Sequence, residues 1–114
     1  MTLRDIQALL GGRLLTAGTI PDAECPRVFA SDLMSDVLAF MDSGSILVTG
    51  LVNPHVVRTA SLVDASAIVI VQGKRPDPST VAEADRNHLP IIATECSMFE
   101  TCSRISRSLD GVRR

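Results

Sequence analysis

The sequence contains very few aromatic residues: they make up 3% of its 114 residues, and Trp and Tyr are absent. Proteins that bind single-stranded nucleic acid stack the bases on aromatic side chains, so this scarcity counts against such a function. The formal net charge of -2 argues in the same direction, because a nucleic-acid-binding domain is usually strongly basic. We therefore expect no nucleic-acid partner, and we expect a core built from aliphatic residues.

Signals for export and membrane insertion are missing as well. Arg4, Asp5 and Gln7 interrupt the first residues, and no apolar run approaches the length of a membrane span. The three Cys residues are an odd number, which favours reduced thiols over a disulfide framework. The sequence therefore predicts a cytoplasmic protein that does not bind membranes.

The motifs of several catalytic and cofactor sites are absent too. A Walker A loop requires Gly-x-x-x-x-Gly-Lys-Ser/Thr, but Arg75 follows Gly73-Lys74, and Ile68 stands where the first Gly belongs. The dinucleotide-binding Gly-x-Gly-x-x-Gly, the Gly-x-Ser-x-Gly elbow and the paired Cys or His residues of zinc sites are also missing. We expect no cofactor, no metal and no enzymatic activity.

The centre of the chain holds a strand–helix–strand pattern. Residues 45–51 and 67–71 are short, mostly β-branched apolar runs, which is typical of parallel strands buried on both faces. Between them, Asn53 can cap a helix and Pro54 suits its first turn. The pattern predicts a βαβ crossover. The apolar stripe of its helix is expected to comprise Val56, Val57, Ala60, Leu62 and Val63.

Strands and helices alternate on both sides of this unit. Further strands are predicted at residues 13–17, 27–30 and 90–94. The alternation predicts an α/β fold, a three-layer sandwich with a mainly parallel sheet of about five strands. The chain is expected to form one domain over residues 1–114, with a flexible tail at residues 110–114.

The starts of the other helices are marked by residues that cap helices well. These capping positions are Thr2, Ser31-Asp32, Asp77 and Ser97, the last with Glu100 at capping-box spacing. Apolar periodicity further predicts that Leu33, Leu38 and Phe99 face the core.

Several segments resemble stand-alone proteins of the DRTGG-domain family. Residues 31–38 (SDLMSDVL) are similar to the SDLLSDVM segment of these proteins. The similarity continues through residues 46–50 (ILVTG), 71–77 (VQGKRPD), 90–94 (PIIAT) and 99–100 (FE). It extends over nearly the whole chain, and the order and spacing of the segments make it fairly specific.

The resemblance implies a fold like the N-terminal domain of HPr kinase/phosphorylase. Similar domains are non-catalytic regulatory parts of some pyrophosphatases and phosphotransacetylases, and some stand-alone members are encoded beside iron-only hydrogenase subunits and histidine kinases. This implies a regulatory or accessory module that acts as a homodimer or higher homo-oligomer and through a partner enzyme or kinase. Two turns depart from the Gly-Gly pattern of the family, because Leu51 replaces the second Gly of Thr-Gly-Gly and the later turn contains Gln72-Gly73-Lys74.

The carboxyl ends of the predicted parallel strands are the expected place for a ligand. Helix N-termini at this edge direct N–H groups toward phosphate or carboxylate, and Lys74 and Arg75 add positive charge. The alternative is that these turns and caps have no ligand. The candidate ligand-binding residues, for a nucleotide or another anionic small ligand, are Thr49, Gly50, Asn53, His55, Gln72, Gly73, Lys74, Arg75, Thr94 and Ser97.

A second hypothesis concerns Cys96. It lies between a predicted strand and a predicted helix, a position that can favour a reactive thiolate. The alternative function is therefore a redox-responsive accessory protein that uses Cys96, in a hydrogenase or histidine-kinase system. The plainer interpretation treats Cys96 and Cys102 as small buried hydrophobic residues. Asp32 and Asp36, one helical turn apart, are interpreted as a cap and a solvated residue in preference to metal ligands.

Overall fold

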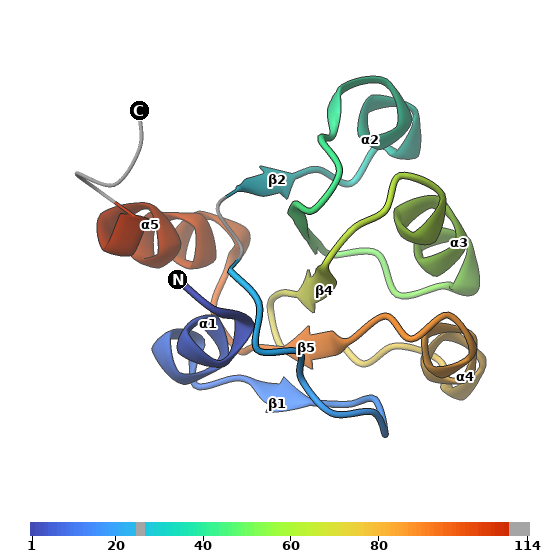
Figure 1. Cartoon of the computed structure of the whole chain (residues 1–114), viewed down its shortest axis with the longest axis horizontal. Coiled ribbons are helices and arrows are strands. Elements are labelled where there is room, and N and C mark those ends of the chain that lie inside the picture. Colours follow the sequence, from blue (N-terminus) through green and yellow to red (C-terminus); the bar gives the residue numbers. More distant parts are fainter. Residues whose placement is uncertain (25–26, 110–114) are drawn as a thin grey trace.

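A five-stranded sheet with the order β1-β5-β4-β3-β2 organises the fold (Figure 1). The computed structural model describes residues 1–24 and 27–109. The strands are β1 (Arg13–Leu14), β2 (Val28–Ala30), β3 (Ile46–Thr49), β4 (Ala67–Ile70) and β5 (Ile91–Ala93). The helices are α1 (Leu3–Leu10), α2 (Met34–Phe40), α3 (Pro54–Leu62), α4 (Pro78–Arg86) and α5 (Met98–Leu109). Four strands are parallel, and β1 pairs with β5 in the antiparallel direction.

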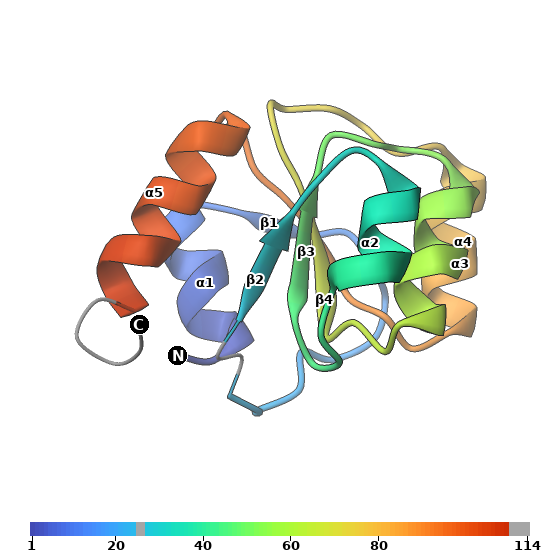
Figure 2. The same ribbon diagram turned by 90° about the horizontal axis from the view of Figure 1, so that it is seen from above.

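The sheet lies between two layers of helices, so the predicted three-layer sandwich is confirmed. Figure 2 shows α1 and α5 on one side of the sheet and α2, α3 and α4 on the other. Two separate cores result: one contains Ile6, Val48 and Ile105, and the other contains Leu47, Val57 and Ile70.

The two central strands have the predicted burial on both faces. Every residue of β3 and β4 is buried. Along β3, Ile46 and Val48 pack in the core under α1 and α5, whereas Leu47 packs in the core under α2, α3 and α4. This alternation explains why the strands contain almost no polar residue, because either face would otherwise bury a polar group without a partner.

The predicted helix starts are observed in most cases. The Asn53 side chain accepts a hydrogen bond from the Val56 N–H at the start of α3, at 3.3 Å. Thr2 and Asp5 form a complete capping box at α1. The Ser97 hydroxyl accepts a hydrogen bond from the Glu100 N–H at 3.0 Å. Asp77 occupies the N-cap position of α4, although its side chain makes no capping hydrogen bond.

The predicted start of the second helix was wrong, because α2 begins at Met34 with Leu33 as its N-cap. Ser31 and Asp32 lie before the helix in a turn, in which the Leu33 N–H donates to the Ser31 hydroxyl at 3.0 Å. The Asp32 side chain bonds to Thr49 and not to the start of the helix. The helix therefore begins later, and Leu33 has 58% of its surface exposed.

Three further apolar residues were wrongly predicted to be buried. Leu38, Leu62 and Phe99 have 50%, 77% and 82% of their surface exposed. Only the innermost positions of each helix reach the sheet, for example Val37 in α2 and Ile105 in α5. The strand predicted at residues 13–17 is also shorter, since β1 ends at Leu14. The tail predicted at residues 110–114 lies outside the described residues.

In the part of the chain that the structure describes, no helix has the length and hydropathy needed to cross a membrane.

Candidate functional site

The carboxyl ends of β3, β4 and β5 lie at one edge of the sheet, as the parallel pairing requires. The turns that leave these strands contain Gly50, Gly73 and Glu95, and the turn after β2 contains Asp32. Most of the candidate ligand-binding residues come from these turns. Hydrogen bonds link the turns to one another in two groups, one around Gly50 and the other around Gly73.

The first group joins three turns around Gly50. The Asp32 carboxylate accepts hydrogen bonds from the Thr49 hydroxyl at 2.9 Å and from the Gly50 N–H at 2.7 Å. The Lys74 ammonium donates to the Gly50 carbonyl at 3.3 Å. A Cβ atom at Gly50 would lie 3.0 Å from the Lys74 Nζ, so glycine gives the close approach that these contacts need. Asp32, which was interpreted as a helix cap, instead joins the turns at this edge of the sheet.

The second group fixes the turn after β4. Gln72 and Gly73 both have a φ of 64°, and the Lys74 N–H donates to the Val71 carbonyl at 3.3 Å, which is the arrangement of a type I′ turn. A non-glycine residue such as Gln72 seldom adopts this conformation, and such residues often lie at functional sites.

The backbone of this turn is already paired. The N–H groups of Gln72 and Gly73 donate to the carbonyl groups of Cys96 and Thr94, at 2.7 and 2.9 Å. The Thr94 hydroxyl donates to the Leu10 carbonyl at 2.9 Å. These bonds hold the turn after β4, the end of β5 and the end of α1 together, and the N–H groups of Gln72 and Gly73 are therefore not free to bind an anion.

A pocket of about 610 Å³, here named the carboxyl-edge pocket, lies beside this turn. Its lining comprises Gly11, Arg13, Leu15, Gly73, Lys74, Arg75, Pro76, Pro78, Val81, Ala93 and Glu95. Three of the predicted residues, Gly73, Lys74 and Arg75, therefore line one cavity. The pocket also contains Arg13, which was not among the predicted site residues.

Arg13 reaches this edge because β1 is antiparallel. The β1–β5 pairing sets Arg13 opposite Ala93, the last residue of β5. The first residue of β1 therefore lies at the carboxyl end of the parallel strands. Sequence analysis would have placed Arg13 at this edge only if it had predicted that the segment 13–17 pairs in the antiparallel direction.

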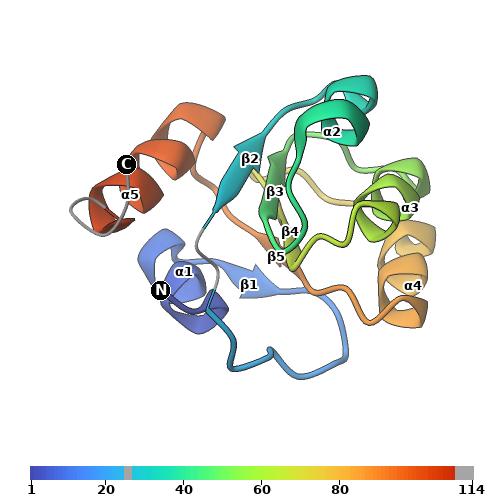
Figure 3. The same ribbon diagram turned by 45° about the horizontal axis from the view of Figure 1, so that its top comes forward.

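The position of the pocket follows from the helix layers. Figure 3 shows α2, α3 and α4 side by side on one face of the sheet, with β1 at the far end of the sheet beside β5. The α4 residues Pro78 and Val81 line the pocket together with Leu15, which directly follows β1. The layer ends at α4, so the outermost part of the sheet on this face is left to line a pocket.

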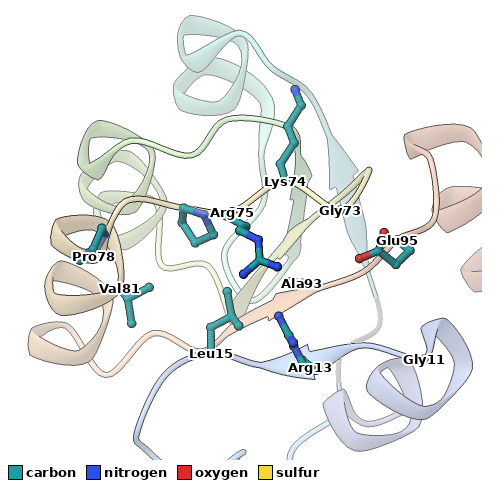
Figure 4. A pocket seen from close by; sticks show the side chains of 11 residues that line it. Gly11, Arg13, Leu15, Gly73, Lys74, Arg75, Pro78, Val81, Ala93 and Glu95 are labelled. Carbon is teal, nitrogen blue, oxygen red and sulfur yellow. The ribbon is translucent and has the colours of Figure 1, made fainter.

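The charged residues of the pocket point in different directions. Figure 4 shows the guanidinium groups of Arg13 and Arg75 turned toward one another, whereas Lys74 extends away from them. The direction of Lys74 agrees with its hydrogen bond to Gly50. Two exposed guanidinium groups therefore face the pocket, and Glu95 contributes a carboxylate to its lining. Paired guanidinium groups are well suited to a phosphate or carboxylate group.

The other candidate residues lie outside the carboxyl-edge pocket. Asn53 and Ser97 cap α3 and α5, and His55 is exposed in the first turn of α3. His88 lines a different pocket of about 600 Å³ with Thr16, Ala17 and Asp85, here named the amino-edge pocket because Pro90, which also lines it, immediately precedes β5. A ligand role for Asn53, His55 or Ser97 stays a prediction.

Cys96 and Cys102 are both half-buried free thiols. The Cys96 Sγ lies 3.9 Å from the Leu10 carbonyl oxygen. Burial raises the pKa of the Cys102 thiol, which lowers its thiolate fraction at neutral pH. Among residues 1–24 and 27–109, no three His, Cys, Asp or Glu side chains are grouped in a way that could hold a metal ion.

The sequence matches the profile of the DRTGG domain over residues 5–108. This chain belongs to the DRTGG-domain family. The match covers nearly all of the chain and confirms the resemblance seen in its segments. None of the curated proteins matches the sequence significantly.

A solved structure shares the fold of this DRTGG domain. It is the crystal structure of the CBS and DRTGG domains of the regulatory region of Clostridium perfringens pyrophosphatase, in complex with its activator, diadenosine tetraphosphate. The TM-score is 0.72 at 15% sequence identity, over 94% of this chain and 46% of that chain. This DRTGG domain thus spans less than half of that regulatory region. The comparison shows a shared fold, and a regulatory role and likeness to HPr kinase stay predictions.

Proposed function

We propose that this DRTGG domain is a non-catalytic regulatory module that senses an anionic small ligand, with nucleotides as the first candidates, in the carboxyl-edge pocket. The observation that carries the proposal is the convergence of Arg13 and Arg75 on one cavity from two separate segments. An unliganded pair of like charges is unfavourable, and an anion between them would relieve the repulsion. The volume of about 610 Å³ is in the range of small-molecule sites.

The pocket also offers a way to transmit binding. Arg13 lies on the short edge strand β1, while Arg75 lies in the turn between β4 and α4. A ligand held by both would tie β1 and the preceding α1 to the rest of the sheet. Since a two-residue edge strand is held by few hydrogen bonds, such a tie would change its local stability.

The comparison with the pyrophosphatase supports the nucleotide candidate at the level of the fold. That protein is complexed with a nucleotide activator in a region that contains CBS domains as well as a DRTGG domain. We infer that regulation by a nucleotide extends to this chain. The arginines of the carboxyl-edge pocket supply the chemical reason for placing the ligand here.

We infer that a second copy of this chain binds at the β2 edge of the sheet. Among the described residues, β2 has a strand partner on one side only. Leu33, which caps α2, and Leu38 and Phe40 of α2 are exposed, with 58%, 50% and 69% of their surface accessible. Unpaired edges next to apolar residues favour association.

Analytical ultracentrifugation of the wild type and of Phe40→Ser tests the proposed contact at the β2 edge. A wild-type dimer that dissociates on substitution supports the contact, and a wild-type monomer at high concentration contradicts it.

Thermal melting with a panel of nucleotides, phosphorylated metabolites and inorganic phosphate tests the ligand proposal. A ligand present at 100 times its dissociation constant adds about 2.7 kcal/mol of stability, which raises the Tm of a domain of this size by about 10 °C. Arg13→Ala and Arg75→Ala should each reduce the rise to about half at the same ligand concentration, as a tenfold loss of affinity predicts. Arg58→Ala is the matched control, since Arg58 is exposed on α3 and does not line the pocket. The proposal fails if no anion in the panel raises the wild-type Tm.

A further inference from the structure

The carboxyl-edge pocket has three chemically different parts. Figure 4 shows the apolar side chains of Leu15 and Val81 on one side of the two arginines and Glu95 on the other. Arg13 and Arg75 form the cationic middle of the lining. A ligand that fills the pocket would therefore be oriented by three different surfaces: an apolar wall, a cationic middle and an acidic end.

The cationic middle suits a single phosphate group. Two guanidinium groups that face one another can each donate two parallel hydrogen bonds to phosphate oxygens. Lys74 adds a third positive charge to the lining, but its ammonium group is bonded to the Gly50 carbonyl. The site for the anion is thus defined by Arg13 and Arg75.

The apolar wall suits a flat ring system. Leu15 and Val81 are half-buried, and Pro76 and Pro78 are further apolar residues of the pocket lining. Such side chains present apolar surface without a hydrogen-bonding group, and a heterocyclic base packs well against surfaces of this kind. A free phosphate ion would leave this wall uncovered.

The acidic end limits the length of the anion. Gly73 has no Cβ, and a Cβ there would lie 2.5 Å from the Glu95 Oε1, so the carboxylate lies directly against the turn. Glu95 is exposed and makes no ion pair among the described residues. A second or third phosphate that extended past the arginines toward Glu95 would be repelled by this carboxylate, because both groups are negatively charged.

We propose that the carboxyl-edge pocket binds a nucleoside monophosphate, with its phosphate between Arg13 and Arg75 and its base against Leu15 and Val81, and that Glu95 selects against longer phosphate chains. This inference rests on the proposed function, since it requires that the pocket bind an anion. It adds the class of the ligand, its orientation and a residue that determines specificity.

Isothermal titration of the whole chain with AMP, GMP, CMP and UMP, their triphosphates and inorganic phosphate tests the inference. The buffer contains no divalent cation, so that the charge of the triphosphates is not screened. At least one monophosphate is expected to bind about tenfold more tightly than its triphosphate and than inorganic phosphate. Glu95→Gln, which keeps the shape of the side chain, should reduce the preference over the triphosphate about fivefold.

Arginine variants show whether the phosphate lies where we place it. Arg13→Ala and Arg75→Ala should each weaken monophosphate binding about tenfold. Arg13→Lys should weaken it less, because lysine keeps the positive charge but cannot donate two parallel hydrogen bonds to the phosphate. Arg58→Ala should bind as the wild type does.

The outcomes separate the two proposals. If a triphosphate or inorganic phosphate binds as tightly as every monophosphate, and does so through Arg13, the inference is wrong while the proposed function stands. The inference is also wrong, and the proposed function again stands, if Glu95→Gln leaves the preference for the monophosphate unchanged. If none of these anions binds the wild type, the inference is wrong, and the proposed function is wrong as well if no anion of the melting panel raises the wild-type Tm.

Discussion

The carboxylate of Asp32 accepts a hydrogen bond from the backbone N–H of Gly50 at 2.7 Å and thereby joins the turn after β2 to the turn after β3. The same carboxylate accepts a second hydrogen bond from the buried Thr49 hydroxyl. The two turns at the carboxyl edge therefore share one acceptor, whose removal would leave two donors unpaired.

Asp32→Ala should lower the free energy of unfolding by about 1–3 kcal/mol, because the Gly50 N–H and the Thr49 hydroxyl are both buried and lose their acceptor. Asp32→Asn should lose less stability, because the amide oxygen of asparagine can still accept a hydrogen bond. Urea denaturation measures both changes. The exposed Asp22 provides a control, because Asp22→Ala is expected to change stability by less than about 0.5 kcal/mol. Equal stability of Asp32→Ala and the wild type would contradict the described contacts.

Leu47→Ala and Leu62→Ala should differ sharply, although both remove the same atoms. Leu47 is fully buried in β3, so its truncation should cost about 2–5 kcal/mol. Leu62 has 77% of its surface exposed at the end of α3, and its truncation should cost less than about 0.5 kcal/mol. Thermal or urea unfolding of the two variants measures the difference, and similar losses would place Leu62 in the core after all.

Asp5 makes the stability of α1 depend on pH. The Thr2 backbone N–H donates to the Asp5 carboxylate at 2.8 Å, and this bond, together with the Thr2 hydroxyl, holds the pKa of Asp5 below its ordinary value. The folded state therefore binds this proton less readily than the unfolded state. Its stabilising contribution is present above the unfolded pKa of about 4 and is lost as the pH falls through the folded value.

The Tm difference between the wild type and Asp5→Ala should accordingly be largest near pH 6 and should shrink as the pH is lowered below about 4. Differential scanning calorimetry across this range measures it. A gap that stays constant or widens on acidification would show that the carboxylate does not cap α1.

Cys102 should react slowly with iodoacetamide in the folded protein. Burial raises the pKa of its thiol, so the thiolate that attacks the reagent is scarce at neutral pH and increases as the pH rises. Digestion with a glutamate-specific protease, which cleaves after Glu95 and Glu100, places Cys96 and Cys102 on different peptides, so mass spectrometry follows each cysteine separately. The urea-unfolded chain gives the reference rate. Equal rates in the two states would be inconsistent with the described burial of Cys102. In the same experiment, a fast reaction at Cys96 would support the redox hypothesis.

Much of the fold could be predicted because local patterns determine it. The apolar runs that became β3 and β4 have no polar face, and this requires helices on both sides of the sheet. The cap at Asn53 was likewise visible in the sequence, since its side-chain hydrogen bond spans only three residues. The start of α2 was missed because Asp32 bonds to Gly50, which is far away in the chain.

The candidate site was only partly predictable for the same reason. Arg75 was accessible to sequence reasoning because it follows a strong strand pattern. Arg13 was not, because its place at the carboxyl edge depends on the antiparallel pairing of β1 with β5. The direction of Lys74, away from the pocket and toward Gly50, also depends on contacts between distant turns.

The location of ligand binding is the most direct test of a regulatory site at the carboxyl edge. We would titrate uniformly ¹⁵N-labelled protein with AMP, GMP, CMP and UMP in turn and follow the amide chemical shifts. For at least one of them we expect the largest changes on residues of the carboxyl-edge pocket, namely Arg13, Gly73, Arg75 and Glu95. Changes confined to the amino-edge pocket around Thr16 and His88, or a spectrum that all four leave unaltered, would contradict this expectation.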